Sequence, residues 1–180
     1  MSKKILITGG PGTGKTSLFK SLISDGFVGF EEKSREVTNT YKKKGIDQLF
    51  LTNPLLFSDL LLKSRVNQFV DSNKIKGTNV FFDRGIPDVI AYLDFKKMKY
   101  GQHYTNACKN YRYDVVFILR PWKDIFVNDK ERYESFEESL EIDKYIYKTY
   151  TNLKYSVVEI PNMSIIKRKD FVINNMKKYD

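Results

Sequence analysis

A lysine and a hydroxyl-bearing residue stand together at the end of a glycine-rich run near the start of the chain. Residues 9–16 read Gly-Gly-Pro-Gly-Thr-Gly-Lys-Thr and fit the spacing G-x-x-x-x-G-K-[ST] completely. In such a loop the backbone N–H groups turn toward phosphate oxygens, the lysine reaches the β- and γ-phosphates, and the hydroxyl ligates Mg²⁺. We therefore expect ATP and Mg²⁺ to bind here, and the residues expected to hold them are Gly10, Pro11, Gly12, Thr13, Gly14, Lys15, Thr16 and Ser17.

A carboxylate that can share the metal with Thr16 follows another apolar run. Val80-Phe81-Phe82 ends in Asp83, which is the pattern of a buried strand whose terminal carboxylate holds Mg²⁺ or its water. Arg84 comes next and can approach a transferring phosphoryl group or an acceptor phosphate with two parallel hydrogen bonds. The alternative for Arg84 is an ion pair that only holds the end of the strand.

Charged residues also follow the apolar run 27–30. A carboxylate near the phosphates can orient the hydroxyl of an alcohol acceptor and accept its proton, and Glu32 is the candidate for this general base. Arg35 is a candidate for contacting the acceptor. The alternative is that Glu32 and Glu36 only pair with Arg35 or Arg84, and the residues by themselves leave both interpretations open.

The segment 122–134 is highly charged and breaks the hydrophobic periodicity, so we interpret it as a mobile flap. A flap that closes over the γ-phosphate would expel water that otherwise wastes ATP. The cations available for such a contact are Arg120, Lys123, Lys130 and Arg132. The nucleotide base is expected against loop backbone near Asn162, and the lack of an Asn-Lys-x-Asp guanine signature favours adenine over guanine.

Five apolar runs separated by helical patterns determine the expected architecture. Strands are predicted at residues 5–7, 27–30, 80–83, 115–119 and 156–160. Helices are predicted at residues 17–23 and 54–69, from residue 87, and at 100–113, 136–154 and 165–178, with a loop at 45–53. In the helix 136–154, one face is expected to carry Phe136, Leu140, Tyr147 and Tyr150.

This alternation predicts an α/β fold. We expect a three-layer sandwich with a five-stranded, parallel, doubly wound sheet, helices on both faces and a short lid. No repeat, low-complexity tract or linker divides the sequence, so residues 1–180 are predicted to form a single domain.

Composition narrows the class of protein. The chain holds one cysteine and one histidine, too few for structural zinc, a disulfide scaffold or a histidine-dependent triad. The net charge of +9 suits phosphorylated ligands, anionic membranes or nucleic acid. The lysines are scattered and no nucleic-acid-binding motif is present, so no specific nucleic acid is predicted.

The sequence also bears on where the protein works. It contains no run of about eighteen apolar residues, and the first four residues lead directly into a predicted strand without room for a signal peptide. We therefore expect no transmembrane segment and a cytoplasmic location, while the oligomeric state is left open.

Taken in order, these motifs resemble those of a known group. The phosphate loop, Glu32-x-x-Arg35-Glu36, the block from Phe81 to Asp88, Tyr-Arg-Tyr-Asp at 111–114 and Asp129-x-x-Arg132 are similar to blocks in predicted ATPases that carry the AAA label. That group is similar to the ribosylnicotinamide kinase domain of a bifunctional NAD-biosynthesis regulator and, more remotely, to nucleoside and nucleotide kinases.

The resemblance spans nearly the whole chain and implies a small P-loop kinase-like fold, because the second region of homology and the sensor residues of ring-forming ATPases are missing. It favours Arg132 among the flap cations and supports Glu32 as the acid that meets the acceptor. One departure is Arg120-Pro121-Trp122, where relatives often have an acidic residue before Pro-Trp.

The leading hypothesis is an ATP-binding, Mg²⁺-dependent phosphotransferase that acts on a small hydroxyl-bearing acceptor of nucleoside or nucleotide type. The alternative is a nucleotide-binding switch or slow NTPase whose bound state regulates a partner or a lipid surface. The basic charge keeps this alternative open, and the flap would be its moving element.

Overall fold

Each apolar run of the sequence forms a strand of one parallel sheet in the computed structural model, which describes residues 2–127 and 134–177. The strands are β1 (Lys4–Gly9), β2 (Val28–Phe30), β3 (Val80–Asp83), β4 (Val115–Leu119) and β5 (Val157–Ile160). Their order in the sheet is β2-β3-β1-β4-β5, and every neighbouring pair is parallel. This confirms the predicted five-stranded, doubly wound sheet.

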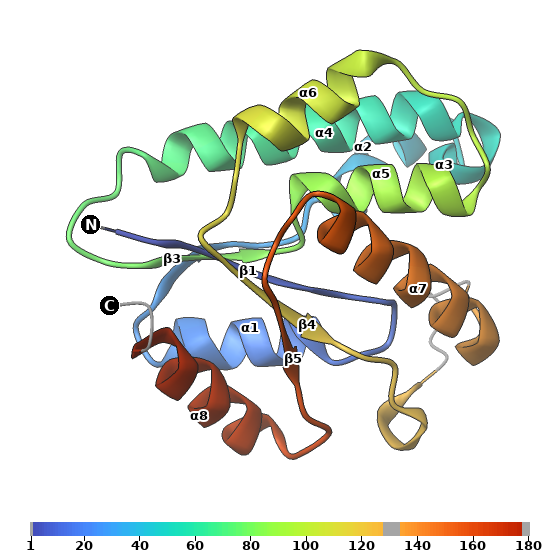
Figure 1. Ribbon diagram of the computed structural model, residues 1–180. Helices are drawn as coiled ribbons and strands as arrows, with labels where there is room; N and C mark the ends of the chain where they lie inside the picture. Colours follow the sequence, from blue (N-terminus) through green and yellow to red (C-terminus); the bar gives the residue numbers. More distant parts are fainter. Residues whose placement is uncertain (1, 128–133, 178–180) are drawn as a thin grey trace.

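Helices cover both faces of the sheet, as expected for the three-layer sandwich (Figure 1). The helices described are α1 (Lys15–Ser24), α2 (Ser34–Lys42), α3 (Leu49–Thr52), α4 (Pro54–Ser72), α5 (Ile86–Phe95), α6 (Gln102–Asn110), α7 (Phe136–Asn152) and α8 (Ile165–Met176). Helices α1 and α8 lie on one face, whereas α4, α5, α6 and α7 lie on the other. None of the helices in the described part of the chain combines the length and the apolar composition of a membrane span.

The strands alternate their side chains between two cores because successive residues of a strand point to opposite faces. Leu6 and Phe82 belong to the core under α4 to α7, while Ile7 and Phe81 belong to the core under α1 and α8. All four side chains are buried. The central strands are therefore apolar on both sides, which explains why they read as continuous hydrophobic runs.

The register of the sheet brings the carboxyl ends of β1, β3 and β4 together. Ile7 pairs with Asp83 on one side of β1, and Gly9 pairs with Leu119 on the other. Gly9 has φ +140, and a Cβ atom there would lie 2.1 Å from the Leu119 carbonyl oxygen, so only glycine fits. The phosphate loop consequently leaves β1 close to the end of β3, as the argument from parallel sheets requires.

Two local predictions were wrong. The loop expected at 45–53 contains the single helical turn α3, which begins after a left-handed Gln48 and buries Leu49. One buried leucine gives no periodic pattern, so the turn was not recognisable in the sequence. In α7 the expected apolar face is displaced: Leu140 is 40% exposed, and the buried stripe is Ser139, Ile142, Asp143, Ile146, Thr149 and Tyr150.

Candidate active site

The phosphate loop joins the buried strand β1 to helix α1. Gly12 and Gly14 both have positive φ, at 73° and 86°, and Gly14 is the N-cap of α1 with no side chain to cap it. The first amides of α1 thus keep their N–H groups available to an anion, and the helix dipole adds partial positive charge. Lys15 folds back over this loop, because its Nζ donates to the Gly10 carbonyl at 2.5 Å and to Thr13 Oγ1 at 3.2 Å.

Burial makes the charged form of Lys15 less favourable than that of an ordinary lysine. Its side chain is 6% exposed, and burial lowers its pKa from 10.5 to about 7, with repulsion from Arg84 acting in the same direction. The carboxylates of Asp83, Glu32 and Asp88 oppose this shift without cancelling it. An anionic ligand in the loop would restore the proton to the lysine.

Thr16 and Asp83 meet at the opening between β1 and β3. Thr16 Oγ1 donates to Asp83 Oδ2 at 3.1 Å, while Asp83 Oδ1 is buried and has no hydrogen-bond partner in the described part of the chain. Burial raises the pKa of Asp83, and attraction to Lys15 only partly offsets it. A hydroxyl beside an unpartnered carboxylate oxygen is a donor set that suits Mg²⁺, so these two residues fit the expected metal.

Glu32 lies between two arginines. Arg84 Nε donates to Glu32 Oε2 at 2.7 Å, and Arg65 Nη2 donates to Glu32 Oε1 at 3.0 Å. Burial raises the pKa of Glu32, but Arg84 and Arg65 outweigh it and hold that pKa below its usual value. The carboxylate is therefore ionised at neutral pH, and it belongs to the same group of interacting charges as Lys15 and Asp83.

Arg84 occupies a strained backbone position. Its φ of 70° is uncommon for a residue with a side chain, and such strain is typical of functional sites. The guanidinium is buried against Tyr92, whose hydroxyl accepts from Nη2 at 3.3 Å, and lies 3.5 Å from Asp88 Oδ1. The ion pair expected as an alternative for Arg84 is present, and its partner is Glu32.

Asp88 is the centre of a buried polar network that the sequence did not reveal. Its carboxylate accepts hydrogen bonds from Thr8 Oγ1 at 2.5 Å, from the Gly85 amide at 2.8 Å and from the Tyr150 hydroxyl at 2.6 Å. The network connects β1, the start of α5 and helix α7 immediately behind Arg84. The signals that the sequence carries for it are an acidic residue in the first turn of an apolar helix and the place of Asp88 at the end of the block that starts at Phe81.

Arg65 was also missed. It lies in the leucine-rich stripe of α4, where helical spacing predicts core, yet its side chain reaches Glu32 and donates to the Gly85 carbonyl at 2.8 Å. A charged residue within an apolar stripe is a usable signal, because such residues are almost never buried without a partner.

Helix α7 supports the other side of the phosphate loop. Ser139 Oγ donates to the Pro11 carbonyl at 2.6 Å, and a Cβ at Gly10 would lie 3.0 Å from the Ser139 carbonyl oxygen. One turn further along, burial raises the pKa of Asp143 to about 6, although Arg120 at 3.0 Å opposes the shift. Two polar residues in the buried stripe of α7, Ser139 and Asp143, are thus explained by the phosphate loop that they approach.

The remaining expected residues are dispersed. Ser17 in the first turn of α1, Arg35 on α2 and Asn162 after β5 are exposed, and Glu36 pairs with Lys33 at 2.5 Å rather than with Arg35 or Arg84. Arg120 pairs with Asp143 and stacks over Tyr147, so it is held by α7. In the expected flap, Lys123–Ile125 form a 3-10 helix, whereas Lys130 and Arg132 lie outside the described residues.

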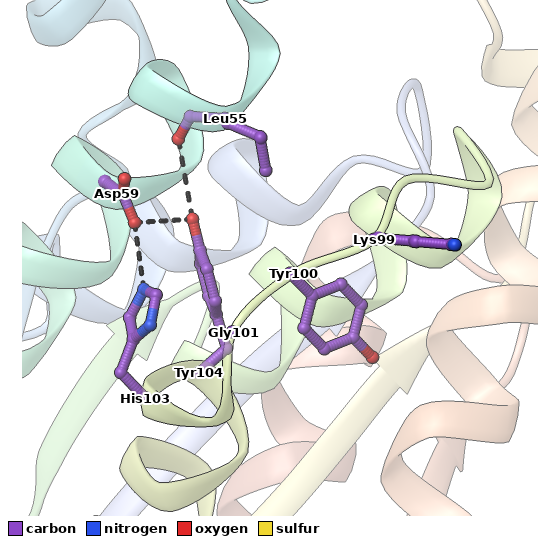
Figure 2. Close-up of a pocket in the computed structure, with 7 residues that line it drawn as sticks. All are labelled: Leu55, Asp59, Lys99, Tyr100, Gly101, His103 and Tyr104. Atoms are coloured by element: carbon purple, nitrogen blue, oxygen red, sulfur yellow. Dashed lines mark hydrogen bonds and ion pairs between the residues drawn. The ribbon is translucent and has the colours of Figure 1, made fainter.

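A separate surface hollow of about 260 Å³ lies between α4, α6 and the turn before α6 (Figure 2). Three of the polar side chains in it bind one another: Asp59 Oδ1 accepts from the Tyr104 hydroxyl at 2.6 Å and lies 3.1 Å from His103 Nε2. The hollow shares no residue with the phosphate loop. We therefore place the candidate active site at the loop and not here.

Comparison with known proteins identifies the family of the chain and supports its fold. The model of the AAA domain family matches residues 4–168, and no curated protein matches the sequence. A NadR protein in complex with NR has a TM-score of 0.75 at 18% identity, over 99% of this chain and 51% of that one. The chain thus spans about half the length of NadR.

Two further solved structures are similar over nearly their whole length. Deoxyadenosine kinase from M. mycoides, with dCMP and dCDP bound, has a TM-score of 0.71 at 17% identity and covers 97% of this chain and 99% of its own. Thymidylate kinase from Ehrlichia chaffeensis has a TM-score of 0.67 at 18% identity and covers 97% and 98%. At these identities the likeness concerns the fold, which is that of P-loop kinases.

Proposed function

The chain belongs to the AAA domain family, and from this premise we propose that it is a kinase that transfers the γ-phosphate of ATP to a hydroxyl of a nucleoside-like or nucleotide-like acceptor. The deoxyadenosine and thymidylate kinases that share its fold support a reaction of this class. The observation that carries the proposal is Glu32, an ionised carboxylate held by Arg65 and Arg84 beside the phosphate loop. A carboxylate in this position can orient an acceptor hydroxyl and accept its proton.

In the donor half of the site, the loop amides and Lys15 hold the β- and γ-phosphates. Thr16 and Asp83 hold Mg²⁺, with the unpartnered Asp83 Oδ1 as a ligand or as the acceptor for a bound water. The metal, when bound, supplies positive charge that neutralises the phosphate oxygens. Ser17 and Asn162 complete the nucleotide contacts in this proposal, at the first turn of α1 and in the loop after β5.

In the acceptor half, Glu32 orients the hydroxyl and takes its proton. As the proton moves to the carboxylate, the hydroxyl oxygen forms a bond to the γ-phosphorus, and the bond from that phosphorus to the bridging oxygen breaks to release ADP. The low pKa of Glu32 makes it a weak base, so its largest contribution is to orientation. Arg84 stands next to Glu32 and can neutralise charge on the transferred group.

Two residues at the edge of the site have proposed roles. We assign Arg35, exposed in the first turn of α2, to contact with the acceptor, and Arg132, which lies outside the described residues, to contact with the γ-phosphate. Both roles follow from the resemblance and from the charge of these side chains. The proposed setting for this reaction is the cytoplasm.

The test is ADP release from ATP and Mg²⁺ in the presence of nucleosides, nucleotides and ribosides, with mass spectrometry of each acceptor. A kinase releases ADP faster with at least one acceptor, and that acceptor gains a phosphate. Lys15→Ala is the inactive control, since it loses donor binding and turnover together. Tightly held nucleotide with no stimulation by any acceptor would favour the switch, which regulates a partner or lipid surface.

A further inference from the structure

Arg168 on α8 is buried although its neighbours in the sequence are at the surface. It is 1% exposed, while Lys167 is exposed and Lys169 pairs with Asp25 at 2.5 Å. Burial lowers the pKa of Arg168, and no acidic side chain counters this effect in the described part of the chain. A buried cation without a carboxylate partner is costly, so its position calls for a specific reason.

The guanidinium touches the phosphate loop. Arg168 Nη1 donates to the Thr13 carbonyl at 2.9 Å, a contact between residues 155 positions apart in the sequence. A Cβ on Gly14 would lie 3.1 Å from the same nitrogen, so the absence of a side chain at Gly14 allows the approach. Arg168 Nε is buried and has no hydrogen-bond partner among the described residues.

The direction of this bond decides what it does. In a trans peptide the carbonyl and the amide point in opposite directions, and no cis peptide is present in the described chain. Since the Thr13 carbonyl points to Arg168, the Gly14 N–H is turned away from this guanidinium, and we take that side to be the inner side of the loop. An inward N–H is what a phosphate oxygen requires.

We propose that Arg168 is a positioning residue for the donor phosphates: it holds the peptide between Thr13 and Gly14 so that the Gly14 N–H faces them. The proposal deepens the proposed function and rests on it. The positive charge of Arg168 should also favour phosphate binding. A polyphosphate in the adjacent loop would supply the negative charge that the buried guanidinium lacks.

The segment after β4 holds Arg168 in place. The guanidinium carbon lies 5.2 Å from the centre of the Trp122 ring, within the range of a cation–π contact. Ile125 and Phe126, which follow Trp122 in the same segment, also reach the phosphate loop. Ile125 approaches Gly14, and Phe126 approaches Gly12. The root of the expected lid is therefore in direct contact with the outer side of the phosphate loop.

The experiment measures binding of ATP and of inorganic tripolyphosphate by calorimetry in the full chain, with Arg168→Met, Arg168→Lys and the matched control Lys167→Met. Arg168→Met should weaken both ligands about tenfold and by the same factor, as expected for the loss of one charge-assisted hydrogen bond. Arg168→Lys keeps the charge, and its affinities should lie between those of the unmodified protein and those of Arg168→Met. Lys167→Met removes the neighbouring surface charge and should bind like the unmodified protein.

A second readout separates positioning from simple support of the fold. In ¹⁵N-labelled protein, tripolyphosphate should shift the Gly14 amide resonance strongly in the unmodified chain and weakly in Arg168→Met, while both chains give dispersed spectra. Equal affinities and equal Gly14 shifts would overturn the inference and leave the kinase proposal standing. Failure of the unmodified protein to bind either ligand would overturn both. If Arg168→Met does not fold, the comparison is made with Arg168→Lys, whose unchanged affinity and Gly14 shift would also overturn the inference.

Discussion

The Thr16 hydroxyl donates to the Asp83 carboxylate at 3.1 Å and thereby joins the first turn of α1 to the carboxyl end of β3. The two residues are 67 positions apart in the sequence, yet the register of β1 against β3 places them together. The second oxygen of Asp83 is left without a partner. This is the arrangement on which the expected metal depends.

Replacing Asp83 by Asn should remove the dependence of ATP turnover on Mg²⁺ while the fold is retained. The amide keeps the shape of the side chain but lacks the charge that a divalent cation needs, so we expect phosphoryl transfer to fall by at least about 100-fold. The measurement is turnover over a Mg²⁺ titration, with Asp71→Asn as a control for loss of a surface carboxylate. Normal Mg²⁺ dependence in Asp83→Asn would remove this residue from the metal site.

The pKa of Lys15 makes nucleotide binding dependent on pH. In the free protein this pKa is about 7, against 10.5 for an ordinary lysine, and bound phosphates should raise it. At a pH between the pKa of the free protein and the higher pKa of the complex, Lys15 takes up a proton when ATP binds. The affinity for ATP should therefore fall by up to about tenfold per pH unit above pH 7. Calorimetry at pH 8.5 in buffers of different ionisation enthalpy should show an uptake of nearly one proton.

Lys15→Arg is the matched control, because arginine keeps its proton throughout this range and should show no uptake. The stability of the protein without nucleotide should rise with pH, whereas its affinity for ATP falls. The unfolded chain binds more protons than the folded one between pH 7 and 10.5, so the free energy of unfolding from Lys15 should rise across that window. Binding without proton uptake in the unmodified protein would contradict the lowered pKa.

Glu32→Gln should leave ATP binding intact and lower transfer to an alcohol acceptor by about 100-fold, because the charged carboxylate that orients the hydroxyl and accepts its proton is lost. The amide still accepts a hydrogen bond from one arginine, so the change tests the charge more than the shape of the side chain. Glu31→Gln is the control, since that neighbour is exposed. Unchanged transfer would mean that Glu32 only pairs with Arg65 and Arg84.

The lowered pKa of Glu32 also predicts how the stability of the protein changes at acid pH. The folded-state pKa of Glu32 is lowered, so its contribution to stability is fully present above its ordinary pKa and is lost as the pH falls through the lower value. Comparison of urea unfolding for the unmodified chain and Glu32→Gln at pH 7 and at about pH 4 should show the difference in stability shrinking toward the acid end. A difference independent of pH would contradict the lowered pKa.

The sequence was sufficient to predict the fold and the position of the glycine-rich loop at the end of β1, because both depend on local patterns. Apolar runs gave the five strands, and the glycine spacing identified the phosphate loop before any contact was known. The meeting of Thr16 with Asp83 also followed, since the carboxyl ends of parallel strands lie at one edge.

The buried charges around the candidate site were only partly predictable because their contacts join distant elements of the chain. Arg65 looked like part of a leucine stripe, and Arg168 like part of a solvated basic cluster at 167–169. Arg65 donates to the Gly85 carbonyl and Arg168 donates to the Thr13 carbonyl. No sequence pattern indicates that these carbonyls accept a hydrogen bond from a buried arginine. The same limit explains the displaced face of α7, whose polar residue Ser139 is buried by the loop it supports.

Of these buried charges, Asp88 should be the one whose substitution lowers the stability of the protein most. Its carboxylate has no exposed surface, accepts hydrogen bonds from Thr8, Gly85 and Tyr150, and faces the cation of Arg84. Asp88→Asn keeps the size of the side chain but turns an amide toward groups that donate, and it leaves Arg84 with one carboxylate fewer. We expect the free energy of unfolding to fall by about 3 kcal/mol, the cost of breaking a buried charge pair.

Asp94→Asn provides the comparison on the same helix. Asp94 lies at the partly buried end of α5 and accepts one hydrogen bond from the Tyr100 hydroxyl at 3.0 Å, so its loss should cost about 1 kcal/mol or less. Urea unfolding of both variants gives the two values directly. Because Asp88 also holds Arg84, the same variant should weaken acceptor use more than ATP binding. If Asp88→Asn were as stable as Asp94→Asn, the network behind Arg84 would not be what fixes it beside Glu32.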